Sequence, residues 1–259
     1  MTAELRKIAK AFVEARRSGT ILPDYPGTRP ADLATAYAIQ DCALALWERE
    51  VGGWKVGKIN PPNDTQLGAN RLVGPAFADQ ILHDAGKGSH AFPIFHDGFA
   101  AVEAEFMLRL SPRAGDLPTS PLEAMEWIDE VRIGVEIASS PYAAINADGP
   151  CVTVSDHGNN YGLLLGRTIP RDEWHGLDDV PISLSINGNV VGQATTATML
   201  DGPFGAVCFL LRNLTDRGIA PQAGWWVSSG AITGVHEVSV GDSVQAQFGE
   251  VGGLDVEIT

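Results

Sequence analysis

Ala101-Val-Glu-Ala-Glu-Phe-Met-Leu-Arg-Leu110 alternates apolar with other residues, and this period of two predicts a β-strand. Successive side chains of a strand point to opposite faces, so Glu103 and Glu105 share one face. The other face is apolar and carries Val102, Ala104, Phe106, Leu108 and Leu110. Neighbouring carboxylates repel and raise a pKa unless a cation lies between them, and hard ions such as Mg2+ or Mn2+ prefer oxygen ligands. The pattern indicates a metal site, with Glu136 of Val135-Glu-Ile137 as a third carboxylate.

The two glutamates also have a simpler interpretation, as solvated residues on the wet face of a half-buried strand. Such strands commonly alternate apolar and charged residues. Glu136 favours the metal interpretation, because it lies in the apolar run Ile133-Gly-Val-Glu-Ile-Ala138. An unpaired carboxylate is costly to bury there, so a partner is expected.

Composition restricts the class of protein. A chain of 259 residues with 44% hydrophobic content can bury a full core without disulfides. Cys42, Cys151 and Cys208 are widely separated and have no metal-ligand spacing, which favours a reduced, cytoplasmic setting. No apolar run reaches membrane-spanning length. A net charge of −14 argues against binding to nucleic acid or an anionic membrane, but it permits a small anionic substrate held by a metal or a lysine.

The order of local patterns predicts an α+β fold. Apolar residues recur at helical spacing up to Gly19 and again over about 31–50. Ser120-Pro-Leu-Glu123 is a capping box that predicts a helix before the Glu136 strand. Asn187-Gly188 between alternating residues predicts a β-hairpin, and 203–217 has a helical apolar pattern. The chain should therefore begin with helices and continue mainly as strands.

A series of short motifs follows in a characteristic order. They are Trp54-Lys-Val-Gly57, Phe77-Ala-Asp79, Val102-Glu-Ala-Glu105, Gly134-Val-Glu-Ile137, Val154-Ser-Asp-His-Gly-Asn-Asn-Tyr-Gly162, and Ser228-Ser-Gly230 followed by Val240-Gly-Asp242. Over most of the chain, this order resembles the 2-keto-4-pentenoate hydratase and 4-oxalocrotonate decarboxylase group of the fumarylacetoacetate hydrolase superfamily. The resemblance implies N-terminal helices followed by a mixed β-roll or sandwich. We expect residues 1–60 to form a helical segment packed on the core, and residues 61–259 to form a metal-binding β-roll catalytic domain.

The same resemblance implies a lyase. Glu103, Glu105 and Glu136 match the carboxylates that hold a divalent metal in the group, here Mg2+ or Mn2+. The substrates implied are 2-hydroxy-2,4-dienoates or their 2-oxo tautomers, which are small acids of aromatic catabolism. Our first hypothesis is a hydratase, in which the dienol is ketonised by a proton at the far carbon before water adds to the double bond. The alternatives are a 4-oxalocrotonate type decarboxylase, an acylpyruvate carbon-carbon hydrolase, and an inactive paralogue that binds a 2-oxo acid. The group also favours homo-oligomers.

Three residues of these motifs are candidates for catalysis. Lys55 could pair with a substrate oxygen or transfer a proton after desolvation lowers its pKa, although it could also be a surface lysine. Asp79 is a candidate for positioning substrate or water, or else a turn residue. His157 stands where relatives often have asparagine, so it could be a proton carrier or a substrate contact.

Four polar residues are candidates for substrate binding, namely Asp156, Asn159, Asn160 and Ser229. Ser229 occupies a position where relatives often have threonine, and its alternative role is a hydroxyl that bonds the backbone at a strand end. The chain has no Gly-x-Gly-x-x-Gly, P-loop or Gly-x-Ser-x-Gly motif in a strand-turn-helix context. It therefore gives no support to dinucleotide, ATP or serine-hydrolase chemistry.

Overall fold

The N-terminal helices form where the apolar spacing predicts them. A computed structural model describes residues 2–86, 88–113 and 115–259. Helix α1 (Ala3–Ser18) is capped by Thr2 and ends at Gly19, which adopts the left-handed conformation. Helix α2 (Leu33–Trp47) begins after Asp32, whose side chain accepts a hydrogen bond from the backbone N–H of Thr35. Among the described residues, no helix is both long and apolar enough to cross a membrane.

The larger sheet contains the two longest strands, β5 (Phe99–Leu110) and β6 (Ile128–Ser140), as antiparallel neighbours. Its strand order is β2-β1-β10-β5-β6-β7-β3, and β11 also pairs with β5. The other strands are β1 (Val51–Lys58), β2 (Arg71–Phe77), β3 (Ile81–His83), β7 (Asn160–Ile169), β10 (Trp226–Ser228) and β11 (His236–Glu237). Because β1–β10 and β3–β7 are parallel and the other pairs antiparallel, the sheet is mixed.

Strand β1 bears on the expected division of the chain at residue 60. That boundary assigns β1 to the N-terminal segment, although β1 pairs with β2 and β10 inside the larger sheet. The division into two parts stays a prediction.

The second sheet has the order β4-β13-β12-β8-β9. Its strands are β4 (His90–Phe92), β8 (Ile182–Ile186), β9 (Asn189–Ala194), β12 (Ser243–Phe248) and β13 (Gly252–Ile258). The predicted hairpin at Asn187-Gly188 joins β8 to β9, and both turn residues have positive φ, 52° and 77°. This is the conformation that Asn-Gly turns favour.

Short helices connect the strands, and one longer helix covers the sheet. The longer helix is α6 (Gly202–Asp216), which begins and ends one residue before the predicted range 203–217. The others are α3 (Asn63–Leu67), α4 (Pro121–Ala124), α5 (Pro150–Ser155) and the 3-10 turns η1 (Ala78–Gln80), η2 (Met125–Trp127), η3 (His157–Asn159), η4 (Arg171–Asp179) and η5 (Thr196–Thr198). The capping box acts as predicted, since Ser120 Oγ accepts a hydrogen bond from the N–H of Glu123.

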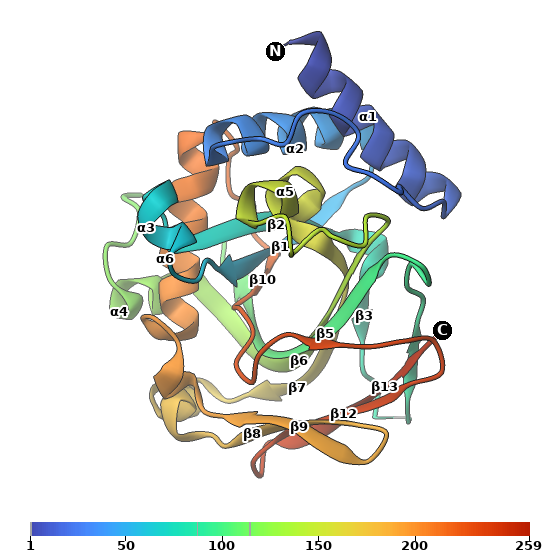
Figure 1. Cartoon of the computed structure of the whole chain (residues 1–259). Helices are drawn as coiled ribbons and strands as arrows, with labels where there is room; N and C mark the ends of the chain where they lie inside the picture. The colour runs from blue at the N-terminus through green and yellow to red at the C-terminus, as the bar shows by residue number, and fades with distance from the viewer. Residues whose placement is uncertain (1, 87, 114) are drawn as a thin grey trace.

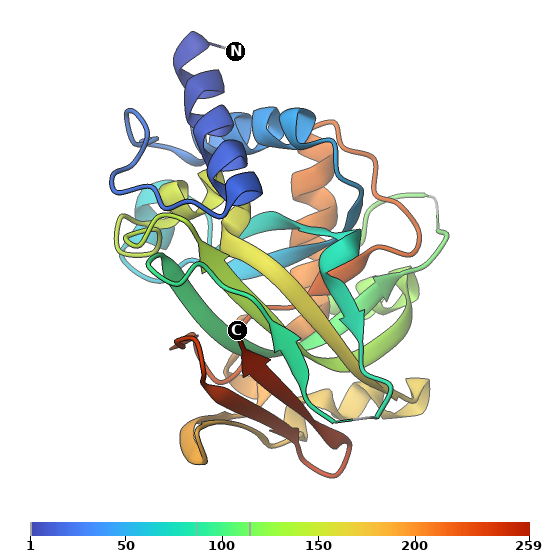
Figure 2. The ribbon, with the colours of Figure 1, turned by 90° about the vertical axis from the view of Figure 1, so that its right-hand side faces the viewer.

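Two buried clusters hold these layers together. Helices α1, α2 and α5 lie at one end of the curled larger sheet, and the second sheet lies at the other (Figure 1), as the rotated view also shows (Figure 2). The larger cluster includes Phe106, Ile133, Leu210 and Phe248, from both sheets and α6. The smaller cluster packs the helices on the sheet and includes Ile8, Phe12, Ile39 and Val152. The result is the predicted α+β arrangement of helices followed by a mixed β-roll.

Candidate functional site

Strand register brings the three predicted glutamates together. In the antiparallel β5–β6 pair, Glu103 lies directly opposite Glu136, and Glu105 follows two residues later on the same face of β5. One carboxylate oxygen from each of the three lies within 4.8 Å of the others. All three residues are buried, with exposed fractions of 4%, 0% and 0%. Their burial contradicts the interpretation of a solvated strand face.

The glutamate oxygens are only partly satisfied by hydrogen bonds. Glu105 Oε2 accepts hydrogen bonds from Ser228 Oγ and, at 2.8 Å, from the backbone N–H of Gly230. Asn160 Nδ2 donates to Glu136 Oε1 at 2.9 Å. Glu105 Oε1 and Glu136 Oε2 have no hydrogen-bond partner within the described part of the chain. Buried polar atoms are rarely left unpaired, so these two oxygens are suited to binding a cation.

Electrostatics leads to the same conclusion. Burial raises the pKa of Glu103 to about 7, an effect that Lys55 opposes and Glu136 reinforces. Burial also raises the pKa of Glu105 well above its ordinary value, and Glu136 and Glu103 add to the rise. Clustered buried carboxylates are stabilised as anions by a cation between them, and oxygen-only donors suit hard divalent ions. The residues present therefore fit a divalent metal.

Lys55 lies on β1 beside the glutamates and is only 4% exposed, so it is not a surface lysine. Its Nζ is 3.3 Å from Glu136 Oε1 and donates to Asn159 Oδ1 at 3.3 Å. Burial alone would lower the pKa of Lys55, but Glu136, Glu103 and Glu105 together raise it above the ordinary value. The expectation of a lowered pKa considered burial alone, because sequence spacing did not show that three carboxylates surround the amine.

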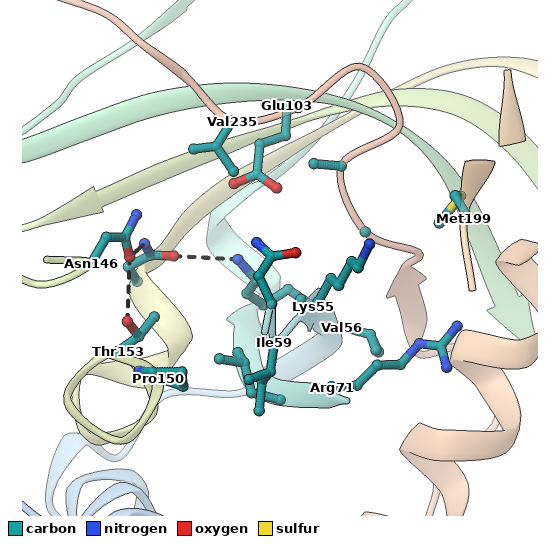
Figure 3. A pocket seen from close by; sticks show the side chains of 18 of the residues that line it. Lys55, Val56, Ile59, Arg71, Glu103, Asn146, Pro150, Thr153, Met199 and Val235 are labelled. Carbon is teal, nitrogen blue, oxygen red and sulfur yellow. Dashed lines mark hydrogen bonds between the residues drawn. The ribbon is translucent and has the colours of Figure 1, made fainter. Parts of the chain in front are cut away.

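A cavity of about 670 Å3 opens beside these residues. Figure 3 shows Glu103, Lys55 and Asn146 around the same space, with Arg71 and Met199 farther along its wall. The predicted substrate contacts Asn159 and Ser229 both line the cavity. Asn159 Nδ2 donates to Asn146 Oδ1 at 3.0 Å. Ser229 Oγ is buried and has no hydrogen-bond partner among the described residues, so it is available to a ligand.

Asp79 and His157 lie away from this cavity, contrary to expectation. Asp79 is in the turn η1, where its carboxylate is 68% exposed and pairs with Arg49. His157 is completely buried, with its ring 5.5 Å from the ring of Phe77 and 6.1 Å from that of Trp47. Its Nδ1 is 3.6 Å from Asp156 Oδ1, which is longer than a hydrogen bond. The loop conformation directs His157 towards the helices and Asn159 towards the cavity.

Asp156 and Asn160 also do not line the cavity. Asp156 is buried and forms an ion pair with Arg16 of α1. Although burial opposes it, Arg16 lowers the pKa of Asp156 to about 2. Asn160 reaches the site through its hydrogen bond to Glu136. We did not identify Arg16 from the sequence, although it lies on the same helical stripe as Phe12 and Val13, and an arginine on a buried face needs a buried partner.

Comparison with known proteins agrees with this fold. No protein-family model matches the chain. A 4-oxalocrotonate decarboxylase of Pseudomonas sp. is 26% identical over 99% of this chain and 98% of its own length. A 2-keto-4-pentenoate hydratase of Paraburkholderia xenovorans (strain LB400) is 28% identical over 99% of this chain and 96% of its own length.

A solved structure extends the likeness to three dimensions. It is the 4-oxalocrotonate decarboxylase from Pseudomonas putida G7 in complex with magnesium and adipate, with a TM-score of 0.83 and 21% identity. The alignment covers 100% of this chain and 99% of that chain. Together with the sequence relatives, this structure confirms the resemblance inferred from the motifs and the fold expected from it.

Proposed function

We propose that this chain, a member of the 2-keto-4-pentenoate hydratase and 4-oxalocrotonate decarboxylase group, is a divalent-metal-dependent lyase acting on small 2-oxo acids or their 2-hydroxydienoate tautomers. One observation carries the proposal. Glu103 lines the cavity together with Lys55, and Glu105 and Glu136 lie next to Glu103, with one carboxylate oxygen of each of the three within 4.8 Å of the others. Glu105 and Glu136 each keep one oxygen without a hydrogen-bond partner among the described residues. We expect the subunits to form a homo-oligomer, which analytical ultracentrifugation would test.

The three glutamates would hold Mg2+ or Mn2+. When bound, such an ion supplies a Lewis acid that polarises the oxygen of a 2-oxo acid. The hydrogen bonds from Ser228, Gly230 and Asn160 orient the carboxylates, so little reorganisation is needed.

Lys55 provides positive charge where an anionic substrate needs it. Its ammonium group attracts the substrate carboxylate or the adjacent oxygen, and it can hold the proton that ketonisation of a dienol requires. Asn159 fixes the amine by accepting its hydrogen bond. Ser229 Oγ can donate a hydrogen bond to the bound acid. Farther along the cavity, the buried side chains of Ile59 and Leu72 keep water from the substrate tail.

Hydration is our first choice among the possible reactions, and decarboxylation is the second. Relatives named for each activity align over nearly the whole chain. Both reactions use the same dienolate. In hydration it takes a proton before water adds, and in decarboxylation it forms when the conjugated 2-oxo group accepts the electrons left by the departing CO2. Carbon-carbon hydrolysis is less well supported, because it needs a His/Glu pair and no described residue lining the cavity is a histidine.

The test is turnover of 2-hydroxypenta-2,4-dienoate and of 4-oxalocrotonate with Mg2+ and with EDTA. Loss of dienol absorbance with gain of one water indicates hydration, release of CO2 indicates decarboxylation, and two shorter acids indicate hydrolysis. We expect EDTA, Glu136→Gln and Lys55→Ala each to abolish turnover. Binding of Mg2+ and oxalate without turnover of any substrate would instead identify an inactive 2-oxo acid binding paralogue.

A further inference from the structure

We propose that Arg16 of the N-terminal helix α1 is a positioning residue for the candidate site. It holds the loop 156–160, whose two asparagines contact Lys55 and Glu136. The kinetic part of this inference rests on the proposed function, whereas the contacts and their effect on metal affinity do not.

The loop 156–160 has a backbone that needs external support. His157, Gly158 and Asn159 are consecutive and have positive φ values of 55°, 64° and 57°. Residues other than glycine seldom adopt this conformation, and it persists only where surrounding contacts enforce it. The unusual turn places Asn159 in the cavity wall and Asn160 beside Glu136. Both contacts therefore depend on whatever holds the loop.

Arg16 makes the contacts that can enforce this conformation. Its side chain is 3% exposed and donates to both carboxylate oxygens of Asp156, at 2.5 and 2.9 Å. It also donates to the backbone oxygens of Asn160 at 3.1 Å and Ser139 at 3.0 Å. A planar guanidinium can make this set of bonds, whereas a lysine ammonium offers a single point of attachment. Arg16 thus holds both ends of the loop and the end of β6.

Two short paths lead from Arg16 to the site. Along the first, Arg16 fixes the backbone oxygen of Asn160, whose side chain donates to Glu136 Oε1. Along the second, the same loop presents Asn159 Oδ1 to Lys55 Nζ. Arg16 itself does not line the cavity. Its loss should therefore misplace Glu136 and Lys55 without removing a ligand or a proton donor.

The competing explanation is that Arg16 only attaches α1 to the core. However, α1 already buries an apolar face containing Ile8, Phe12 and Val13, which packs against α2 and belongs to the smaller buried cluster. If Arg16 were only an attachment, its variants would be less stable, but the folded molecules would bind metal and turn over substrate normally. Metal affinity and kcat therefore separate the two explanations.

The experiment compares Arg16→Lys, Arg16→Gln and the control Arg217→Gln. Arg217 is a similarly buried arginine with an 8% exposed side chain, and it pairs with Asp41 and Gln40 of α2. Among the described residues it makes no hydrogen bond to the loop 156–160. The Mg2+ dissociation constant is measured by titration calorimetry well below each melting temperature, and kcat and KM are measured with the substrate that the wild type accepts. We expect both Arg16 variants to raise the Mg2+ dissociation constant about tenfold and to lower kcat more than they change KM. Arg16→Lys keeps a charge opposite Asp156, so it should be more stable than Arg16→Gln. Arg217→Gln should lose stability, but its Mg2+ dissociation constant, kcat and KM should stay within about twofold of the wild-type values.

Several results would overturn the proposal. If Arg16→Lys binds Mg2+ and turns over substrate like the wild type, Arg16 only attaches α1 to the core. If Arg16→Gln does not fold, Arg16→Lys alone distinguishes the two explanations. If the wild type turns over no substrate, the proposed function fails, but the ratio of Mg2+ dissociation constants still tests the positioning role. If the wild type binds no Mg2+, the positioning role fails together with the metal site.

Discussion

Glu105→Gln should remove most of the stabilisation of this protein by Mg2+ without harming the fold. Glutamine has the same shape, and its carbonyl oxygen can still accept the hydrogen bonds from Ser228 and Gly230. The substitution removes one of three buried carboxylates that lie within 4.8 Å of one another. At this distance and an effective dielectric constant of 20, two unit charges repel by roughly 3 kcal/mol. The metal-free variant should therefore be at least as stable as the metal-free wild type.

The expected size of the metal effect follows from binding linkage. A ligand at 100 times its dissociation constant stabilises the native state by about 2.7 kcal/mol. For a chain of this length, about 1 kcal/mol shifts the melting temperature by about 2–4 °C, so the wild type should gain about 5–10 °C. If loss of Glu105 weakens Mg2+ binding about 100-fold, the same Mg2+ concentration should stabilise the variant by only about 0.4 kcal/mol, or about 1 °C.

The assay is differential scanning calorimetry of EDTA-treated protein with and without Mg2+. Glu257→Gln is the matched control, because Glu257 is an exposed residue on β13 in the other sheet. This control should keep the full Mg2+ shift. A Glu105→Gln variant that folds and still gains 5 °C or more, as the wild type is expected to, would show that the three carboxylates do not form the metal site.

Three further substitutions test the placement of individual residues. Burial lowers the pKa of His157 below its ordinary value of 6.5, so below about pH 6.5 the unfolded chain binds a proton that the native protein does not, and stability falls. His157→Asn should reduce the dependence of the free energy of unfolding on pH by up to about 1.4 kcal/mol per pH unit, as measured by urea unfolding between pH 7.5 and 5. If the variant and the wild type lose stability equally as the pH falls, His157 is not buried as a neutral ring. Asp79→Asn should leave kcat/KM within about twofold in steady-state assays, because Asp79 pairs with Arg49 outside the cavity; a tenfold loss would restore it as a catalytic candidate. Gly74→Ala would place a Cβ 2.0 Å from the backbone oxygen of His157, so thermal denaturation should show a loss of about 1–3 kcal/mol, and an unchanged stability would contradict that close approach.

Much of the fold could be predicted from local sequence because its signals act over a few residues. The helical spacing before Gly19 and over 203–217, and the Asn187-Gly188 turn, all occur where the structure has α1, α6 and the β8–β9 hairpin. These features depend on backbone preferences and on one buried face, which neighbouring residues specify together. The sequence did not show that β1 would pair with β10, about 170 residues later, because strand pairing depends on distant partners.

The sequence by itself placed Glu103 and Glu105 on one face of a strand, because side chains alternate along any extended backbone. Only the tertiary structure decided that Glu136 lies opposite Glu103, that Lys55 is buried among carboxylates, and that Arg16 contacts the loop 156–160. It also decided that His157 and Asp79 point away from the cavity. These outcomes depend on register, burial and contacts between residues far apart in the chain, and no local pattern encodes them.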